Sequence, residues 1–233
     1  MAGAPVLQVL DGGRVWRGEA APAAAVPVLQ SGLRVLDEAL ALGGLPVGGV
    51  TEVRAGLGHG GLGLGLMAVA ALLTGDAQAR AAVVDGFGTL HGAAVLEAGV
   101  PPGRVWCVRP KEPGRIMALG LRLVRSAAFR LVLVDHALAP PVSQPELAVR
   151  RLAVAAQEAG CVVVLLSGNW GDCLGLPLPS ALRLRVSRQA GQHLNVAVEK
   201  QRGASLTPSV TLPGRLLYSP PHWDLDHAAR PGG

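Results

Sequence analysis

The sequence predicts an α/β fold in which a mostly parallel, twisted sheet is flanked by helices. Strand-like and helix-like segments alternate along the 233 residues, which is the pattern of a parallel sheet with crossover helices. The apolar runs at residues 131–134 and 161–166 are continuous, as expected for strands that are buried on both faces. A glycine-rich loop between a strand and a helix, within residues 52–66, is typical of the same class, since phosphate-binding loops occupy that place.

Five strands are expected in the central sheet, and two later segments should extend it. Residues 182–187 and 194–200 alternate polar and apolar side chains, so we expect them to join as antiparallel strands with one face in water. The clearest helices are residues 114–127 and 145–159. The five central strands are expected at residues 50–54, 81–85, 105–108, 131–134 and 161–166.

The helix at residues 145–159 has the most complete boundary signals. Ser143 is the expected N-cap, Pro145 lies in the first turn, and Glu146 is the partner that a capping box requires. Gly160 follows the last turn, where helices commonly end on a glycine. These residues predict both ends of the helix.

Three parts are expected along the chain. Residues 1–27 form an N-terminal segment that ends in the low-complexity linker AAPAAAVP, and residues 28–203 form the core. Residues 204–233 form a proline-rich tail with a candidate edge strand at 209–212.

The tail carries three large side chains among polar residues, Tyr218, Trp223 and Leu225. Such a segment either stays unpacked or orders against a partner, with these side chains as anchors. Both alternatives are open from the sequence.

The glycine-rich loop has lost the residues with which a P-loop binds phosphate. The consensus is G-x-x-x-x-G-K-[ST]. Aligned on its second glycine, Gly60, the chain has Ala55 followed by Gly56 at the start, Gly61 in place of the lysine and Leu62 in place of the hydroxyl residue. A helix N-terminus alone offers about half a positive charge, which is small against a nucleoside triphosphate. We therefore expect an architectural loop that binds neither nucleotide nor any other cofactor.

The flanks of this loop resemble the ATPase core of RecA. Upstream, SGLRVLDEALALGGLPVGGV (residues 31–50) has a helix with L-D-x-A-L, then G-G-L-P-x-G before the strand. Downstream, AVVDGFGTLHGAAVLEAGVPPGRVWCVRP (residues 82–110) follows the RecA order of strand, Asp, helix, short strand and Pro. The resemblance covers about residues 15–203, including VWRG at 15–18. In order and spacing the chain is similar to ImuA, the RecA-like accessory protein of bacterial mutagenic translesion synthesis, and more distantly to the cell-division inhibitor SulA.

The resemblance implies that the catalytic site has changed. In RecA, the residue two after the aspartate that matches Asp85 is the glutamate that activates water, and here it is Phe87. The Walker B pattern of an apolar strand followed by an acid is kept in FRLVLVDHA, where Asp135 is the acid. We expect no catalytic residue, and we do not expect the chain to be an enzyme.

The same resemblance implies a non-catalytic adaptor in SOS or DNA-damage-induced mutagenic translesion synthesis and DNA repair. Its partners would be RecA and ImuB, with a specialised polymerase in the same assembly, and it could limit RecA filaments. Two alternatives remain open. One is a SulA-like inhibitor that binds the tubulin-like division protein, and the other is a nucleotide hydrolase with an unusual loop.

Lys200 and Arg202 are candidate partner-binding residues. They lie in a segment similar to the V-x-K-x-K stretch of RecA, which lies at the subunit interface, although a solvated charged edge would have the same pattern. The two loops that hold DNA in RecA are short here, at residues 136–142 and 168–180, and the second has no basic residue. The net charge is +5, but GC-rich coding alone would favour an arginine-rich composition. We expect DNA contact to be weak or indirect.

Other features predict a chain without metal sites or membrane segments. Cys107 and Cys161 lie in apolar, strand-like runs and are expected to be buried. The six histidines lack the spacing of metal ligands, so no metal is expected. Because no stretch offers enough consecutive apolar residues to span a bilayer, we expect a cytoplasmic protein with no membrane contact.

Overall fold

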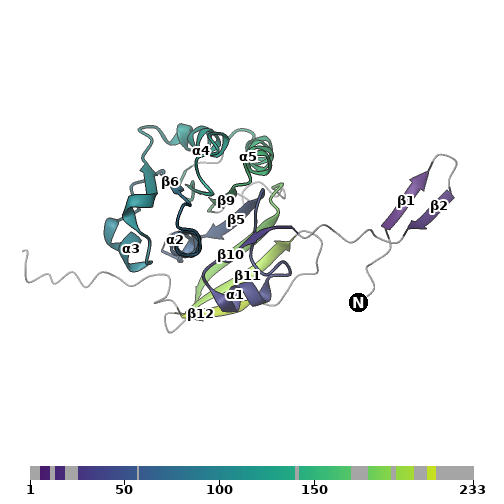
Figure 1. Cartoon of the computed structure of the whole chain (residues 1–233), viewed down its shortest axis with the longest axis horizontal. Coiled ribbons are helices and arrows are strands. Elements are labelled where there is room, and N and C mark those ends of the chain that lie inside the picture. The colour runs from purple at the N-terminus through teal and green to yellow at the C-terminus, as the bar shows by residue number, and fades with distance from the viewer. Residues whose placement is uncertain are drawn as a thin grey trace, which may run out of the picture.

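The structure is a computed structural model of the chain, shown in Figure 1. It describes residues 6–10, 14–18, 26–56, 58–139, 142–168, 178–189, 193–201 and 209–213, the first two ranges by their backbone alone. Within these residues, an eight-stranded sheet carries helices on both faces.

The sheet is mostly parallel, as predicted. All neighbouring strands from β10 to β7 pair in parallel, and β11 and β12 add antiparallel at one edge. In order across the sheet, the strands are β12 (Val210–Pro213), β11 (His193–Gln201), β10 (Leu182–Gln189), β5 (Val50–Ala55), β9 (Val162–Leu166), β8 (Leu131–Asp135), β6 (Ala81–Asp85) and β7 (Val105–Val108). The middle strands β9, β8 and β6 are buried along their whole length, which explains their continuous apolar sequences.

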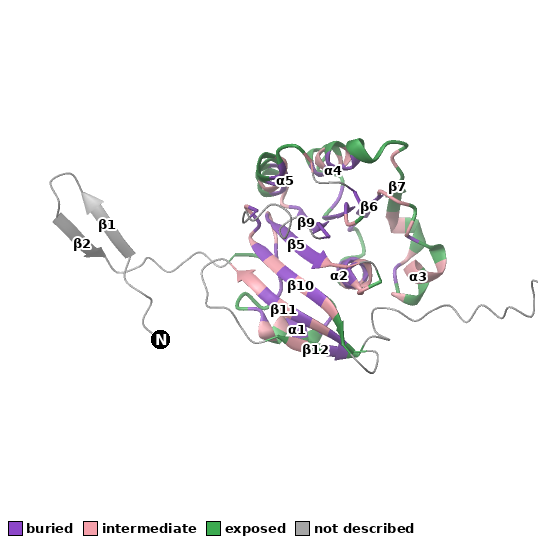
Figure 2. Cartoon of the chain, turned by 180° about the vertical axis from the view of Figure 1, so that it is seen from behind, coloured by how far each residue is buried: buried purple, intermediate pink, exposed green. Residues whose placement is uncertain are grey.

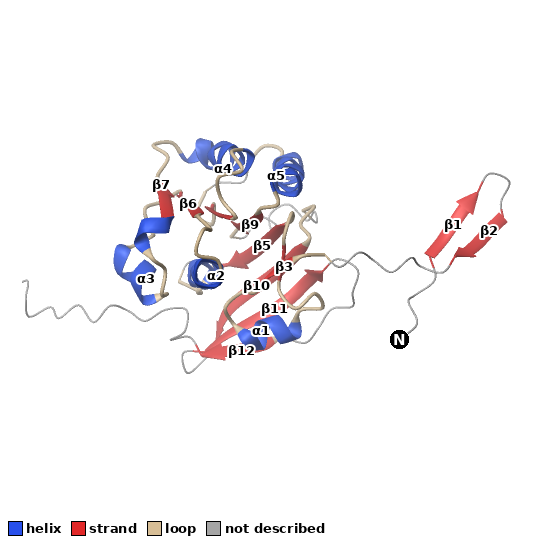
Figure 3. Cartoon of the chain, viewed as in Figure 1, coloured by secondary structure: helices blue, strands red, loops and turns tan. Residues whose placement is uncertain are grey.

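Two hydrophobic clusters hold the helices to the sheet, one on each face. Helix α2 (Gly61–Gly75) packs on one face together with α1 (Arg34–Ala39). Ala94 and Val95 of α3 (Gly92–Glu97) pack against the same cluster. Helices α4 (Ile116–Arg125) and α5 (Pro145–Ala159) pack on the other face and contact each other. Figure 3 shows this separation of the helices around the strands. Short 3-10 turns at Pro102–Arg104 and Pro113–Arg115 precede β7 and α4.

Smaller strand pairs lie before β5, and one strand follows the expected core. β1 (Val6–Leu10) pairs with β2 (Arg14–Gly18), and β3 (Val28–Leu29) pairs with β4 (Leu45–Pro46). The edge strand predicted within the tail is confirmed as β12, whose Leu212 is buried against the sheet. No helix among the described residues is long and apolar enough to cross a membrane.

Three expectations are wrong in detail. β10 pairs antiparallel with β11, as expected, but it runs parallel to its other neighbour, β5. Its polar side chains Arg183 and Arg185 pair with charged residues of other strands rather than facing open water. Figure 2 shows the resulting alternation of buried and intermediate residues on β10 and β11. The N-cap of α5 is Gln144 instead of Ser143, with no side-chain capping bond. Cys107 is exposed because it lies on the outermost strand β7, whereas Cys161 is buried.

Candidate functional site

The glycine-rich loop lies between β5 and α2, as predicted. β5 ends at Ala55, α2 begins at Gly61, and Gly60 between them has a left-handed backbone with φ of +86°. This conformation favours glycine, because a Cβ atom would be strained there. The amide of Leu64 donates to the carbonyl oxygen of Gly60 at 2.9 Å and closes the first helical turn. The strand, turn and helix of a phosphate-binding loop are thus kept.

The position that aligns with the P-loop lysine has no room for a side chain. A Cβ atom on Gly61 would lie 2.8 Å from the Cβ of Ala55, closer than real Cβ contacts allow. A Cβ atom on Gly60 would lie 2.6 Å from Cδ1 of Leu194, which reaches the loop from β11. Leu62, at the position of the hydroxyl residue, packs against the hydrophobic cluster that also contains Leu194 and contacts Ala55. The loop therefore packs as part of the core, and its glycines allow this close approach.

Two buried carboxylates meet where neighbouring strands β6 and β8 end. Asp85 and Asp135 are paired in register and are 1% and 4% exposed. Thr89 joins them: its hydroxyl donates to Oδ2 of Asp135 at 2.9 Å, and its amide donates to Oδ1 of Asp85 at 2.9 Å. Arg109 forms an ion pair with Asp85, with Nε 2.8 Å from Oδ2. We call Asp85, Thr89, Arg109 and Asp135 the carboxylate cluster.

Internal donors hold both acids of the carboxylate cluster. Burial raises the pKa of Asp135, which the amide of Ala137 and the hydroxyl of Thr89 partly offset, while the nearby Asp85 raises it further. Asp85 also accepts from the amide of Leu90 at 3.3 Å, so every carboxylate oxygen in the pair has a donor. This arrangement fixes the ends of two strands, which is a structural role.

Phe87 lies two residues after the end of β6 and packs against the core. Its side chain is partly buried against the hydrophobic cluster under α4 and α5. The position where the resemblance places a water-activating glutamate therefore holds an apolar side chain that packs inward.

A second buried network crosses β5, β9 and β10, and the sequence analysis did not identify it. Glu52 is 0% exposed and accepts from Nε of Arg183 at 2.7 Å. Two hydroxyls complete its shell, from Ser167 at 2.9 Å and from Ser180 at 3.4 Å. The available signal was an acid inside an expected central strand, VTEVRA, because a buried acid requires a partner.

Lys200 lies beside this network and is only partly exposed. Its Nζ donates to the carbonyl oxygen of Leu178 at 3.1 Å, and Nη2 of Arg183 donates to the same oxygen at 3.3 Å. Burial lowers the pKa of Lys200, the charge of Arg183 lowers it further, and Glu52 acts in the opposite direction. The ammonium group of Lys200 thus also contributes to the structure.

Ion pairs continue the network onto β11. Glu199 accepts from Nη1 of Arg54 at 3.0 Å and forms a second ion pair with Arg185. Burial opposes ionisation of Glu199 and is the largest single effect, but the hydrogen bonds from Arg185 and Arg54 outweigh it and lower the pKa. Salt-bridged charges therefore cover the β5–β10–β11 part of the sheet on the side where α4 and α5 cover the other strands.

The structure brings only part of the predicted site together. The loop residues adjoin one another, and Asp135 lies two strands away from β5 across the sheet, with β9 between them. No group of three or more His, Cys, Asp or Glu in the described part of the chain is arranged to hold a metal ion. Four candidate residues lie outside the described residues: Arg202, Tyr218, Trp223 and Leu225.

Comparison with curated proteins shows similarity to RecA. The chain is 33% identical over 117 residues to protein RecA of Treponema pallidum (strain Nichols), across 49% of this chain and 28% of that RecA. It is 28% identical over 128 residues to protein RecA of Borreliella afzelii (strain PKo), across 55% of this chain and 34% of that RecA. No protein-family model matches the chain. The chain thus spans about a third of the length of these relatives, and its mostly parallel sheet flanked by helices agrees with a RecA-like core.

Proposed function

We propose that this chain is a non-catalytic, RecA-like adaptor that acts in the response to DNA damage, in SOS-induced mutagenic translesion synthesis. Similarity to RecA over about half of the chain and a RecA-like core support this role. The observation that carries the proposal is the loop at Gly61, where the position of the phosphate-binding lysine is packed against Ala55. A RecA-shaped protein without that lysine would act through binding rather than through hydrolysis.

The proposed mechanism is occupancy of a protomer position. A chain with the RecA core shape could add to the end of a RecA filament and stop its growth, or recruit ImuB and a specialised polymerase there. Lys200 supports this mechanism because it lies at the end of β11, in the segment that resembles the protomer interface of RecA.

The contacts of Lys200 decide how this face should be tested. A glutamate at position 200 would place a second negative charge near the buried Glu52, so it would disturb folding as well as binding. Lys200→Met keeps the apolar stem, and Arg202→Glu supplies the charge reversal. We expect this double variant to weaken RecA binding by a few kcal/mol, the range found for interfacial charge pairs, with thermal melting measured in parallel.

A deletion of residues 220–233 is the matched test of the tail. If the double variant binds RecA normally and the deletion abolishes binding, the tail carries the contact and the protomer-face idea is wrong.

Side-by-side binding experiments test the adaptor role itself. The purified chain is immobilised and offered RecA, ImuB and the tubulin-like division protein at equal concentration. We expect RecA and ImuB to be retained. Retention of the division protein with neither of the others would contradict the proposal and favour a SulA-like inhibitor.

A further inference from the structure

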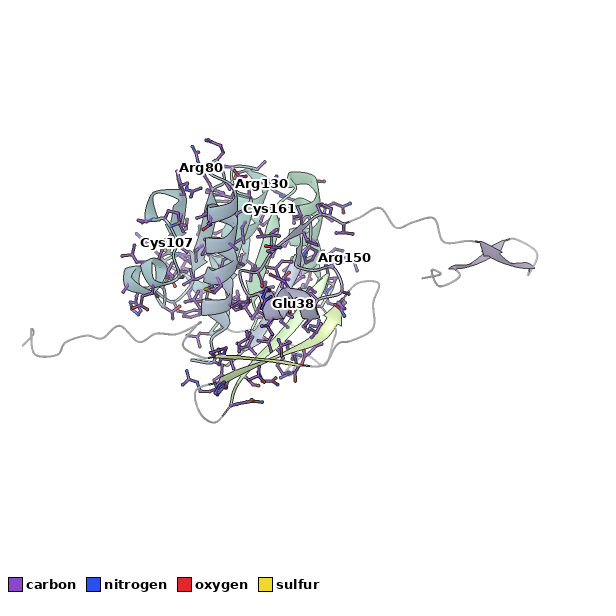
Figure 4. All side chains as sticks on the ribbon, turned by 60° about the horizontal axis from the view of Figure 1, so that its bottom comes forward. Glu38, Arg80, Cys107, Arg130, Arg150 and Cys161 are labelled. Atoms are coloured by element: carbon purple, nitrogen blue, oxygen red, sulfur yellow. The ribbon has the colours of Figure 1, made fainter. Side chains whose placement is uncertain are left out.

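A set of exposed arginines gathers at the N-terminal ends of the parallel strands, opposite the end where the glycine-rich loop lies. Arg80 and Arg130 directly precede the neighbouring strands β6 and β8. The amide of Arg130 donates to the carbonyl oxygen of Arg80 at 2.9 Å, so the two residues are adjacent. Figure 4 shows both labelled side chains near Cys161, the residue just before β9.

Helix α4 brings two more arginines to the same end of the sheet. Arg122 and Arg125 are exposed in its last turn, and the chain then runs through residues 126–129 to Arg130. Residues three apart lie on the same side of a helix, so these two guanidinium groups share a face. We call Arg80, Arg122, Arg125 and Arg130 the basic edge.

No carboxylate pairs with the basic edge within the described residues. The exposed ion pairs of the described residues involve arginines elsewhere in the fold, such as Arg34 with Glu38 on α1 and Arg115 with Glu112 before the start of α4. Acids at helix ends on this side of the sheet are Asp76, whose side chain accepts from the amides of Gln78 and Ala79, Glu97 at the end of α3, and Glu158 in the last turn of α5.

Helix C-termini account for only part of this positive charge. Arg122 and Arg125 lie in the last turn of α4. Arg130 lies at the end of α5, where its Nη1 would be 3.7 Å from a Cβ atom added to Gly160, the C-cap of that helix. Each helix end carries roughly half a negative charge, so two ends offset about one of the four cations. Arg80 lies five residues beyond the last residue of α2, whose terminal carbonyl oxygens accept from Arg104, so most of the charge of the four arginines is left for an anionic partner.

An aromatic ring beside the basic edge indicates what that partner is. Trp106 in β7 is 57% exposed, and it pairs with Ala82, one residue into β6. Its ring centroid lies 5.9 Å from that of Phe129, in an edge-to-face arrangement, and Phe129 directly precedes Arg130. Phe129 is buried and supports the tryptophan, which leaves much of the Trp106 ring open to solvent. Cations next to an exposed ring are the combination that binds single-stranded nucleic acid, through phosphates and stacked bases.

We propose that the basic edge and Trp106 form a binding site for single-stranded nucleic acid, with the arginines on phosphates and the indole stacked on a base. The site lies at the opposite end of the strands from the glycine-rich loop, and its residues belong to neither of the two segments that match the DNA-holding loops of RecA. It does not depend on the proposed adaptor role, because binding at this site requires neither RecA nor ImuB.

Fluorescence anisotropy of a labelled mixed-sequence single strand, titrated with the full chain across a salt series, tests this proposal. The edge variant carries Arg80→Gln, Arg122→Gln, Arg125→Gln and Arg130→Gln. The control variant carries Arg34→Gln, Arg150→Gln, Arg151→Gln and Arg188→Gln, so both lower the net charge of +5 by four. Arg150 lies on α5, about 13 Å along the helix from its end, away from the basic edge.

The two parts of the site should fail in different ways. We expect the edge variant to lose affinity on the order of tenfold or more at low salt, and its slope of log affinity against log salt to fall by about 2.8, that is 0.7 for each of four phosphate contacts. Trp106→Leu should lower affinity by about tenfold with the slope unchanged, since stacking releases no counterions. The control variant should keep nearly the affinity of the wild type. Four Arg→Lys substitutions at the basic edge keep the charge and should preserve binding and slope, which separates charge from folding.

Four results would overturn the proposal. Equal losses in the edge and control variants would mean that net charge alone attracts the strand. A wild-type chain that does not bind the single strand at low salt would have no such site. If the chain bound the corresponding duplex as tightly as the single strand, and Trp106→Leu bound normally, the indole ring would not stack on a base. Equal competition by polyglutamate would indicate a surface for acidic proteins instead.

Discussion

Substitution of Gly61 by alanine tests directly whether the glycine-rich loop is packed as part of the core. Two opposing effects determine the outcome. Alanine lowers the entropy of the unfolded chain and favours helix, which stabilises by up to about 1 kcal/mol. The added Cβ would meet the Cβ of Ala55 at 2.8 Å, and overpacking of this kind costs about 1–3 kcal/mol. We expect Gly61→Ala to lower the free energy of unfolding by about 1–2 kcal/mol.

Gly92 provides the matched control, because it also starts a helix. A Cβ atom there meets nothing within 4 Å, so Gly92→Ala should be neutral or stabilising by up to about 1 kcal/mol. Urea unfolding of both variants measures the difference, and thermal melting should separate them by roughly 4–10 °C for a chain of this size. Equal stability of the two variants would show that the loop is not tightly packed at Gly61 and has room for a larger side chain such as lysine.

Three further perturbations test the buried charges. Arg183→Met should cost about 3–5 kcal/mol, because it leaves Glu52 buried without its cation, and adding Glu52→Gln should recover part of the loss in a double-mutant cycle. Burial lowers the pKa of His136 to about 4, from about 6.5 in the unfolded chain. The contribution of His136 to the free energy of unfolding is therefore present above about pH 6.5, and about 3 kcal/mol is lost as the pH falls to about 4. In urea titrations at different pH values, His136→Gln should remove most of this loss. Burial raises the pKa of Asp135, so its contribution is present at low pH and is lost as pH rises through the folded value; Asp135→Asn should remove that dependence, and an unchanged profile would contradict the assignment.

Local chemistry made several elements predictable. The bounds of β6, β7 and α5 agree with the sequence expectation to the residue. For α5 the reason is that Pro145 can begin a helix and Gly160 can adopt the left-handed backbone that ends one. The N-cap differed because Gln144 intervenes before the proline, and a side chain at position 143 lies one residue too early to cap.

Pairing across the sheet was less predictable. The alternating pattern of β10 predicts one face in water, but the polar side chains Arg183 and Arg185 pair with Glu52 and Glu199 from other strands. These partners are separated by more than 130 residues in one case and 14 in the other, so spacing in the sequence does not reveal them. The residues of the glycine-rich loop are predictable because they are adjacent in the sequence. The approach of Leu194 to Gly60 is not, because the two residues are far apart along the chain.

Calorimetric titration of the purified chain with Mg·ATP tests the central claim, a RecA-like protein that works without nucleotide. We expect no measurable heat of binding for ATP or ADP, because Gly61 and Leu62 stand where the lysine and the hydroxyl residue belong and both are packed against the core. Binding in the micromolar range would mean that the loop still holds nucleotide and that the chain does not work without it.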